Sequence, residues 1–282
     1  MEGALAELRV GFVGGGAMAE ALVAGLAAAG VAASRVRASD PVAARRDQLA
    51  KRFGIAVTAS NADVVAASDL VVLAVKPALV AAVLDEIAAA NPAAAARPLW
   101  LSIAAGVPLS RLSAALPAGA RVVRAMPNTP ALVRSGATAL AAGDSCSAED
   151  RALARALCET VGSVWEAPSE ALLDAVTGLS GSGPAYVFVF LEALSDAGVR
   201  VGLPREAASM LAIQTVLGSA RLALETGRHP AQLKDQVTSP GGTTIAGLER
   251  LEAGGLRAAV YEAVAAATAR SRQLGEDAAK NR

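Results

Sequence analysis

Arg9-Val-Gly-Phe-Val-Gly-Gly-Gly-Ala-Met-Ala19 joins a short apolar run to a glycine-rich turn. A helical pattern follows as far as about Ala29, so the turn connects a strand to a helix. Gly14 permits the tight turn, Gly16 lets the backbone approach a pyrophosphate, and Ala19 stands where helix and strand pack closely. This context favours a dinucleotide-binding fingerprint over a structural glycine-rich turn.

Further apolar runs alternate with helical patterns through the first part of the chain. Leu70-Val-Val-Leu-Ala-Val75 is apolar on both faces, as expected of a central strand in a parallel sheet. The alternation predicts an α/β fold with an N-terminal Rossmann-type domain. The other predicted strands cover residues 35–39, 55–58, 99–103 and 121–125. Late edge strands are expected at 137–142 and 163–166, and the cap signal Ser147-Ala-Glu-Asp150 starts a helix between them.

From Ser169 onward the pattern is almost entirely helical, which marks a second, all-α domain. We expect a dinucleotide-binding domain over residues 1–168 and a helical domain for substrate binding and dimerisation over 169–282. Long apolar helix faces, such as Val187, Phe190, Leu191 and Leu194, predict a homodimer through the helical domain. The predicted helices span 170–179, 184–199, 204–226, 230–237, 244–253 and 256–273.

Composition points to a small-molecule substrate. The 282 residues include 26 Lys and Arg against 26 Asp and Glu, so neither a nucleic-acid footprint nor a polybasic membrane patch is expected. The N-terminus carries acids rather than a basic signal-peptide region, and the longest uncharged run, 175–191, is broken by Gly-Ser-Gly-Pro. We therefore expect a cytoplasmic protein without a membrane segment, in which Cys146 and Cys158 are reduced thiols.

The end of the second predicted strand bears on the choice of coenzyme. Asp40 would accept hydrogen bonds from both adenosine ribose hydroxyls and so favour NAD. Ser39, Arg45 and Arg46 are instead suited to a 2′-phosphate, although the two arginines are equally consistent with a solvated helix face. The sequence leaves both coenzymes open.

Other strand ends complete the candidate coenzyme site. Lys76 follows the central strand and either faces the ligand crevice of the sheet or lies along the surface. Met126-Pro-Asn-Thr-Pro130 is an extended loop that carries a polar pair, while Asn61 caps or precedes a small helix. The candidate coenzyme residues are Gly14, Gly15, Gly16, Ala17, Met18, Ser39, Asp40, Asn61, Ala74, Val75, Lys76, Pro77, Ile103, Ala104, Ala105 and Asn128.

A second glycine turn opens a helix near the C-terminus. Pro240-Gly-Gly is turn chemistry, and apolar residues then recur at helical spacing. The first N–H groups of such a helix lack intrahelical partners, so a carboxylate or phosphate is stabilised there. Thr243 and Thr244 add hydroxyls to this site. The alternative is that both threonines only cap the helix.

Six segments of the chain carry a resemblance to a known family, namely Gly11-Phe-Val-Gly-Gly-Gly-Ala-Met18, Ala74-Val-Lys-Pro77, Ser102-Ile-Ala-Ala-Gly-Val107, Arg124-Ala-Met-Pro-Asn-Thr-Pro130, Val176-Thr-Gly-Leu-Ser-Gly-Ser-Gly-Pro-Ala-Tyr186 and Leu233 to Thr244. Over essentially its whole length the chain resembles the pyrroline-5-carboxylate reductases, in whose order these segments stand. Two of the matching segments, Val176 to Tyr186 and Leu233 to Thr244, are specific to that family, while the glycine fingerprint and Val75-Lys-Pro77 occur in many reductases. Asp40 and Gln236 depart from its usual residues, which are Ser or Thr and Asn.

The resemblance implies an oxidoreductase of amino-acid biosynthesis that acts on a C–N bond and reduces the imine 1-pyrroline-5-carboxylate to L-proline. It implies NADP(H) as the preferred coenzyme with NAD(H) possible, and a homodimer, with a ring of dimers as a further option. Thr244 would bond the imine nitrogen as the catalytic residue, and the backbone of Gly242, Thr243 and Thr244 would hold the substrate carboxylate. Glu170 matches the family's acidic substrate-site residue or is a first-turn helix carboxylate.

Two other readings compete with this one. A 3-hydroxyacid dehydrogenase of the 6-phosphogluconate type shares the fingerprint and the helical second domain, but it needs a catalytic lysine early in that domain. Residues 169–200 contain no lysine. The other alternative is a non-catalytic, dimeric NADPH-sensing module. His229, the single histidine, precedes Pro230 and is expected to cap or pack a helix rather than to catalyse.

Overall fold

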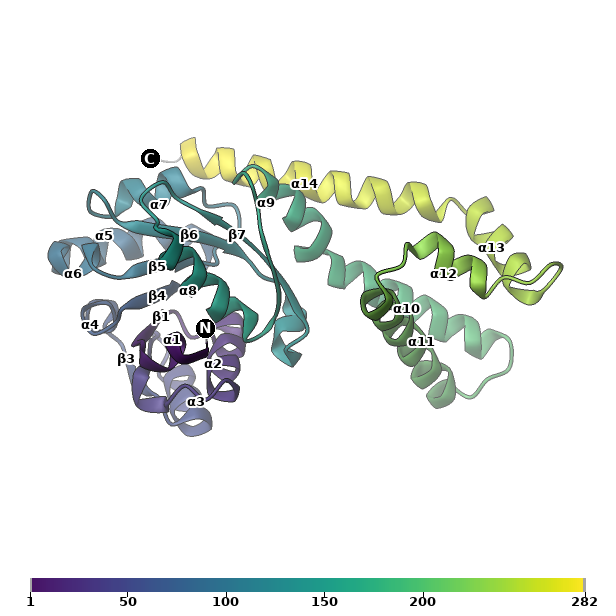
Figure 1. Ribbon diagram of the computed structural model, residues 1–282, viewed down its shortest axis with the longest axis horizontal. Coiled ribbons are helices and arrows are strands. Elements are labelled where there is room, and N and C mark those ends of the chain that lie inside the picture. Colours follow the sequence, from purple (N-terminus) through teal and green to yellow (C-terminus); the bar gives the residue numbers. More distant parts are fainter. Residues whose placement is uncertain (1, 281–282) are drawn as a thin grey trace. The chain divides into compact units, whose positions relative to one another are not determined.

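The computed structural model describes residues 2–280. Its chain forms two compact units, one of residues up to Ser182 together with those from Ala266 on, and one of Gly183–Ala265. Figure 1 labels the elements of both units. This grouping by contact places residues 169–182 and the end of the chain with the first unit, whereas the sequence pattern changes at Ser169.

Among the described residues the first unit contains one eight-stranded sheet in the order β3-β2-β1-β4-β5-β6-β7-β8. Its first six strands are parallel and follow the doubly wound order 3-2-1-4-5-6, so the predicted Rossmann-type fold is confirmed. The strands are β1 (Val10–Val13), β2 (Val36–Ser39), β3 (Ala56–Thr58), β4 (Leu70–Leu73), β5 (Leu99–Ser102), β6 (Arg121–Met126), β7 (Gly136–Ala142) and β8 (Gly162–Glu166).

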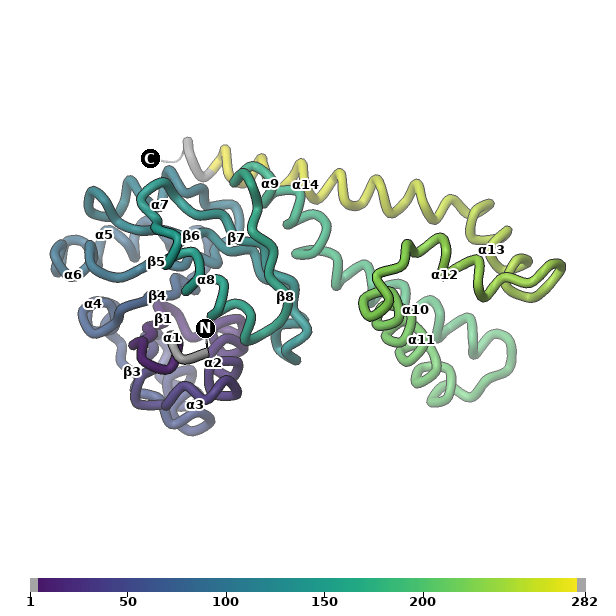
Figure 2. Tube along the Cα trace, in the orientation of Figure 1, coloured from purple at the N-terminus to yellow at the C-terminus, as the bar shows by residue number. Residues whose placement is uncertain are grey.

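Two hydrophobic cores cover the two faces of the sheet, because alternate residues of each strand point in opposite directions. In β4, Leu70 and Val72 join one core, while Val71 and Leu73 join the other. The first core includes residues of α1 (Glu2–Glu7), α2 (Ala17–Ala28), α3 (Ala43–Phe53) and α8 (Ala148–Glu159). The second includes residues of α4 (Asn61–Ala66), α5 (Val80–Ala90), α6 (Pro92–Ala96) and α7 (Leu109–Ala115), and the trace in Figure 2 shows both sets of helices around the sheet.

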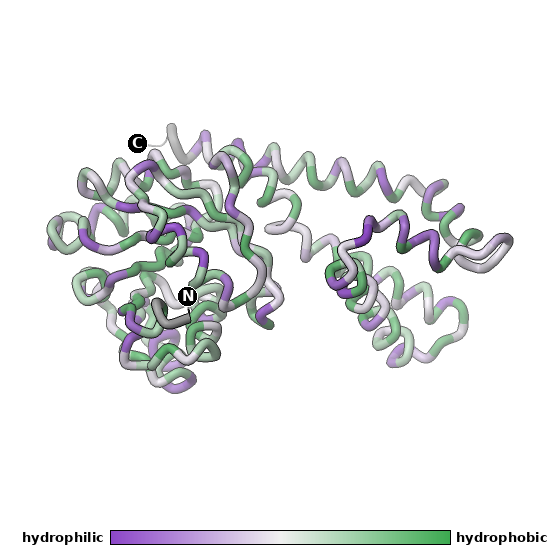
Figure 3. The backbone as a smooth tube through the Cα atoms, in the orientation of Figure 1, coloured by the Kyte–Doolittle hydropathy of each residue, from purple (hydrophilic) through white to green (hydrophobic). Residues whose placement is uncertain are grey.

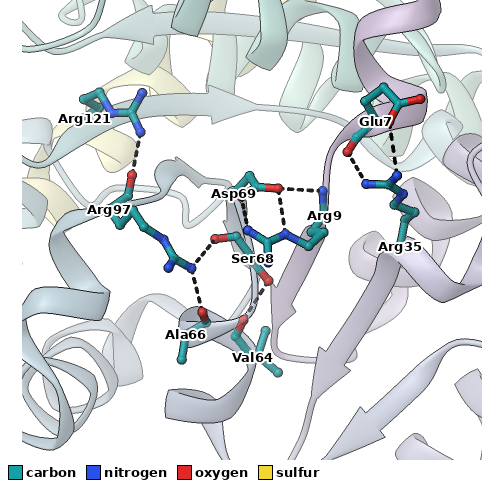
Figure 4. A network of polar contacts seen from close by, with 9 residues as sticks. All are labelled: Glu7, Arg9, Arg35, Val64, Ala66, Ser68, Asp69, Arg97 and Arg121. Carbon is teal, nitrogen blue, oxygen red and sulfur yellow. Dashed lines mark hydrogen bonds and ion pairs between the residues drawn. The ribbon is translucent and has the colours of Figure 1, made fainter.

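Charged side chains tie together the amino ends of the strands (Figure 4). Asp69, just before β4, accepts hydrogen bonds from the backbone N–H of Arg9 at 3.1 Å and from its guanidinium. The hydrogen bonds from Arg9 lower the pKa of the Asp69 carboxyl. Arg121 Nη2 reaches the Arg97 carbonyl at 2.6 Å, and Arg97 Nη2 in turn reaches the Ala66 carbonyl at 2.6 Å. These contacts stabilise the edge of the sheet opposite to the one where the ligands of such folds bind.

Several elements differ from the sequence-based predictions. The short helices α1, α6 and α7 were not predicted. The prediction that residues 137–142 form an edge strand is wrong, because β7 lies between β6 and β8. Asn61 is the first residue of α4, and Ser60 is its cap, accepting from the Asp63 N–H at 3.2 Å. The helix predicted over 170–179 is instead α9 (Leu172–Val176) followed by a π-helical turn, Thr177–Gly181.

The second unit consists of α10 (Gly183–Arg200), α11 (Arg205–Thr226), α12 (Pro230–Gln236), α13 (Thr243–Ala253) and the first part of α14 (Leu256–Lys280). Helices α10 and α11 pack against each other and carry many hydrophobic residues along their length (Figure 3). Most of these side chains are exposed, among them Phe188 at 64% and Leu217 at 58%. Among the described helices, α11 alone is long and apolar enough to cross a membrane, judged by length and composition.

Candidate functional site

The turn after β1 is shaped to bring backbone to a ligand. Gly14 has a φ of +98°, and a Cβ there would lie 2.7 Å from the Ala74 carbonyl oxygen, so a side chain is excluded. Gly16 precedes α2 in extended conformation, and no side chain caps that helix. A Cβ added at Gly16 would meet nothing within 4 Å. The free N–H groups of α2 and the open space beside Gly16 fit a pyrophosphate.

Three of the candidate coenzyme residues, Ser39, Asp40 and Asn61, lie together at the carboxyl end of β2. The Ser39 hydroxyl lies 2.7 Å from Asn61 Oδ1 and is buried. Asp40 accepts from the Gly15 N–H at 2.9 Å and from the Val42 N–H at 2.8 Å. The carboxylate is therefore fixed beside the glycine turn by two backbone donors.

The two arginines of α3 that were considered for a 2′-phosphate, Arg45 and Arg46, differ in their contacts. Arg46 Nη1 donates to the Asp40 carbonyl at 2.7 Å and to the Pro41 carbonyl at 3.0 Å, so it lies just beyond the end of β2. Arg45 is exposed on α3. The Arg46 guanidinium and the backbone of Asp40 are thus in contact just after β2, the position at which dinucleotide-binding folds bind the adenosine ribose of a coenzyme.

The remaining candidate coenzyme residues lie at the carboxyl ends of neighbouring strands. Ala74, Val75, Lys76 and Pro77 directly follow β4, while Ile103, Ala104 and Ala105 directly follow β5. Parallel pairing places these ends on one edge of the sheet. Lys76 is exposed and precedes a short 3-10 turn, Pro77–Leu79.

Glu170 lies in the first unit and makes hydrogen bonds to two of its other residues. Its Oε1 accepts from the Leu109 N–H at 2.7 Å and from Arg124 Nη1 at 2.8 Å. Arg124 is only 5% exposed, so the carboxylate neutralises a buried charge. Glu170 precedes α9 rather than lying in its first turn. These contacts favour a structural role over a substrate contact.

Arg124 was not among the predicted site residues, although it lines a cavity of about 480 Å³ together with Gly106, Asp174 and Arg272. Asp174 there accepts from the Ser271 hydroxyl at 2.7 Å. The sequence did contain a signal for Arg124, because a charged residue inside an otherwise apolar strand requires a buried partner.

The second glycine turn opens α13 in the second unit. Gly241 has a φ of +66°, and Gly242 is the cap residue of the helix, with no side-chain cap hydrogen bond. Thr243 and Thr244 are the first two helical residues, so the alternative in which the threonines cap the helix is wrong. Helix α13 has 11 residues. The backbone N–H groups of its first turn point out of the helix N-terminus, where an anion is stabilised.

A cavity of about 460 Å³ lies beside this turn, lined by Lys234, Gly241, Gly242 and Ile245, among others. Lys234 is paired with Asp235 at 3.2 Å. His229 Nδ1 accepts from the Ala231 N–H at 3.2 Å, which confirms the prediction that this histidine caps a helix.

The two cysteines are free and buried, as predicted. Burial raises the pKa of the Cys158 thiol to about 12 and also raises that of Cys146. Both are neutral thiols at physiological pH and are unsuited to nucleophilic chemistry.

Comparisons with known proteins cover nearly the whole chain. Residues 170–274 match the family model for pyrroline-5-carboxylate reductase dimerisation, and residues 9–106 match that for coenzyme F420-dependent NADP oxidoreductases. A pyrroline-5-carboxylate reductase of Synechocystis is 50% identical over 95% of this chain and 99% of its own length.

Solved structures give the same result. The structure of a pyrroline-5-carboxylate reductase from Coxiella burnetii is 39% identical with a TM-score of 0.89, covering 95% of this chain and 98% of that one. The pyrroline carboxylate reductase of Plasmodium falciparum, solved with NADP bound, is 32% identical with a TM-score of 0.85, covering 96% and 99%.

Proposed function

The chain belongs to the pyrroline-5-carboxylate reductase family, and we propose that it reduces the C=N bond of 1-pyrroline-5-carboxylate to give L-proline. It is an oxidoreductase that uses NAD(P)H. Imine reduction requires a hydride donor, a clamp for the substrate carboxylate and a hydrogen-bond partner for the ring nitrogen. Each requirement has candidate residues in this chain.

The glycine turn after β1 fits a nicotinamide dinucleotide. Gly14 is shaped for the turn, Gly16 leaves open space, and the N-terminus of α2 offers free N–H groups to the pyrophosphate. When bound, the coenzyme supplies the hydride. The protein's task on this side is to hold the pyrophosphate at α2 and the ribose near Ser39, Asp40 and Asn61.

The turn before α13 fits the substrate. The backbone N–H groups of Thr243 and Thr244 would hold the carboxylate at the helix N-terminus, where the macrodipole favours an anion. The Gly242 N–H, which donates to the Ser239 carbonyl at 3.1 Å, would share its hydrogen bond with the carboxylate. The Thr244 hydroxyl would donate a hydrogen bond to the ring nitrogen and orient the imine. A threonine hydroxyl is too weak an acid to be the ultimate proton source, so water or a substrate already protonated as an iminium supplies the proton.

Asp40 is the residue that we expect to influence the choice between NADPH and NADH. The resemblance to the family implies NADP(H), and the relative from Plasmodium falciparum was solved with NADP bound. Arg46, just beyond the end of β2, is compatible with a 2′-phosphate. The Asp40 carboxylate repels that phosphate and accepts from ribose hydroxyls instead. We propose that NADPH and NADH both serve this enzyme and that Asp40 weakens the preference for NADPH.

We assign the two functions, coenzyme binding and substrate binding, to the two domains predicted from the sequence. Residues 1–168 would bind the coenzyme, and residues 169–282 would bind the substrate and form a homodimer. The match of residues 170–274 to the family's dimerisation model supports the homodimer. A ring of dimers would build on that homodimer. The exposed apolar surface of α11 would then be a subunit contact rather than a membrane span, in a cytoplasmic enzyme.

One observation carries the proposal, namely that the chain holds both a coenzyme turn left open at Gly16 and an uncapped helix start at Gly242 that is followed by Thr244. The test is to mix the purified protein with 1-pyrroline-5-carboxylate and either NADPH or NADH and to follow oxidation of the coenzyme. We expect oxidation that depends on the imine. Coenzyme binding without oxidation would support the sensing module instead. Reduction of NADP+ or NAD+ by 3-hydroxyacids, without oxidation of the reduced coenzymes by the imine, would support the dehydrogenase alternative.

A further inference from the structure

The π-helical turn Thr177–Gly181 has a cause in the sequence. The Ser182 N–H donates to the Thr177 carbonyl at 2.8 Å, which is the wide i to i+5 spacing. In an α-helix the Ser180 carbonyl would accept from residue 184. Residue 184 is Pro184, which has no N–H and whose ring would clash with that carbonyl. The Ser180 carbonyl therefore needs a donor from elsewhere.

Asn128 provides this donor. Its Nδ2 donates to the Ser180 carbonyl at 3.0 Å, while its Oδ1 accepts from the Ala137 N–H at 2.8 Å. Asn128 follows the carboxyl end of β6, and Ala137 belongs to β7. One side chain thus joins two strands of the sheet to the π turn.

The turn also packs directly on the end of β6. A Cβ added at Gly181 would lie 2.6 Å from the terminal methyl of Met126, the last residue of that strand. The next residue, Ser182, is the last of the first unit before the chain enters Gly183–Ala265. The turn is therefore held at the edge of the sheet that carries the candidate coenzyme residues, at the point where the chain leaves this unit.

We propose that Asn128 is a positioning residue for the reduction, which acts by replacing the hydrogen bond that Pro184 cannot make. This inference rests on the proposed function. It assigns the side chain of Asn128 to holding the π turn, not to binding the coenzyme. Because small displacements of reacting groups lower rates steeply, loss of this bond should reduce turnover and leave coenzyme affinity intact.

The test is a double-mutant cycle of Asn128→Ala and Pro184→Ala, measured as kcat and as coenzyme Kd. We expect Asn128→Ala alone to lower kcat by about 10-fold while the coenzyme Kd changes by less than about twofold. Pro184→Ala restores an N–H at residue 184, so Asn128→Ala should cost less than about threefold in that background. Asn128→Asp, which keeps the acceptor for Ala137 and loses the donor, is the second variant if Asn128→Ala does not fold.

Asn91→Ala is the matched control, because Asn91 also bonds one backbone N–H, that of Ala94, on an exposed loop before α6. It should leave kcat unchanged. A coenzyme Kd raised 10-fold or more by Asn128→Ala, or equal losses of kcat in both backgrounds, would overturn the inference. If the wild-type protein does not reduce the imine, the proposed function fails, and coupling of the two substitutions in the free energy of unfolding would show the hydrogen-bond replacement separately.

Discussion

At the scale of single residues, we propose that the Asp40 carboxylate determines how strongly this protein prefers NADPH to NADH. We predict that Asp40→Ser raises the ratio of kcat/KM with NADPH to kcat/KM with NADH by about 10-fold, or about 1.4 kcal/mol. The substitution removes a negative charge that repels the 2′-phosphate and leaves Arg46 in place. Steady-state kinetics with both coenzymes measure the ratio. An unchanged ratio would show that the carboxylate serves only the Gly15 and Val42 backbone.

Substitutions at Gly16 and Gly14 should have different effects, the first on coenzyme binding and the second on folding. Gly16→Val should raise the coenzyme KM by about 10-fold or more without lowering Tm, because the new side chain occupies empty space at a φ of −71° that valine accepts. Gly14→Val should fail to fold, since its φ of +98° and the Ala74 carbonyl exclude a side chain. Coenzyme titrations and thermal unfolding separate the two effects. Normal coenzyme binding by Gly16→Val would contradict the assignment of this glycine turn as the dinucleotide-binding fingerprint.

At the scale of elements, the start of α13 is the proposed substrate site. Thr244→Ala leaves the Gly242 cap position and the helix N–H groups in place, so the carboxylate clamp should survive. We predict that kcat falls by about 10-fold or more, about 1.4 kcal/mol or above, while coenzyme Kd is retained. Thr243→Ala, the neighbouring substitution, should be milder. Equal losses in both variants would mean that the turn only starts a helix.

Elements with strong periodicity could be predicted from the sequence, and those determined by distant contacts could not. The strands of the parallel sheet were predictable because both of their faces are buried, which demands unbroken apolar runs. The order of β6, β7 and β8 depends on an antiparallel pairing that no local pattern shows. The break after α9 follows from Pro184 acting on Ser180, but its stabilisation by Asn128 spans 52 residues of sequence.

Among the candidate site residues, too, those marked by local sequence signals could be predicted, and those that depend on distant contacts could not. Glycine turns before helices are local signals, so the residues near Gly14 and Gly242 could be found without a structure. Glu170 could be interpreted either as a substrate residue or as a structural one, because its partner Arg124 lies 46 residues away in sequence. Short helices such as α7 carry too few turns for their periodicity to stand out.

At the scale of the whole molecule, the exposed hydrophobic side chains of α10 and α11 require a partner. We predict that Leu217→Glu, at a residue 58% exposed, shifts the protein toward monomer in analytical ultracentrifugation because it places a charge in the dimer contact. Val42→Glu, at a residue 54% exposed in the first unit, is the control and should leave the dimer intact. A Leu217→Glu protein that sediments like the wild type would exclude this face as the interface.

The chemistry of the whole molecule is tested most directly by following the transferred hydrogen. The protein is incubated with 1-pyrroline-5-carboxylate and a reduced coenzyme deuterated at the transferring position of C4, and the product is analysed by mass spectrometry. We predict L-proline with one deuterium, bonded to the ring carbon that was doubly bonded to nitrogen, and much less of it from Thr244→Ala. Proline without deuterium, or no proline while the coenzyme stays bound and reduced, would contradict hydride transfer to the imine.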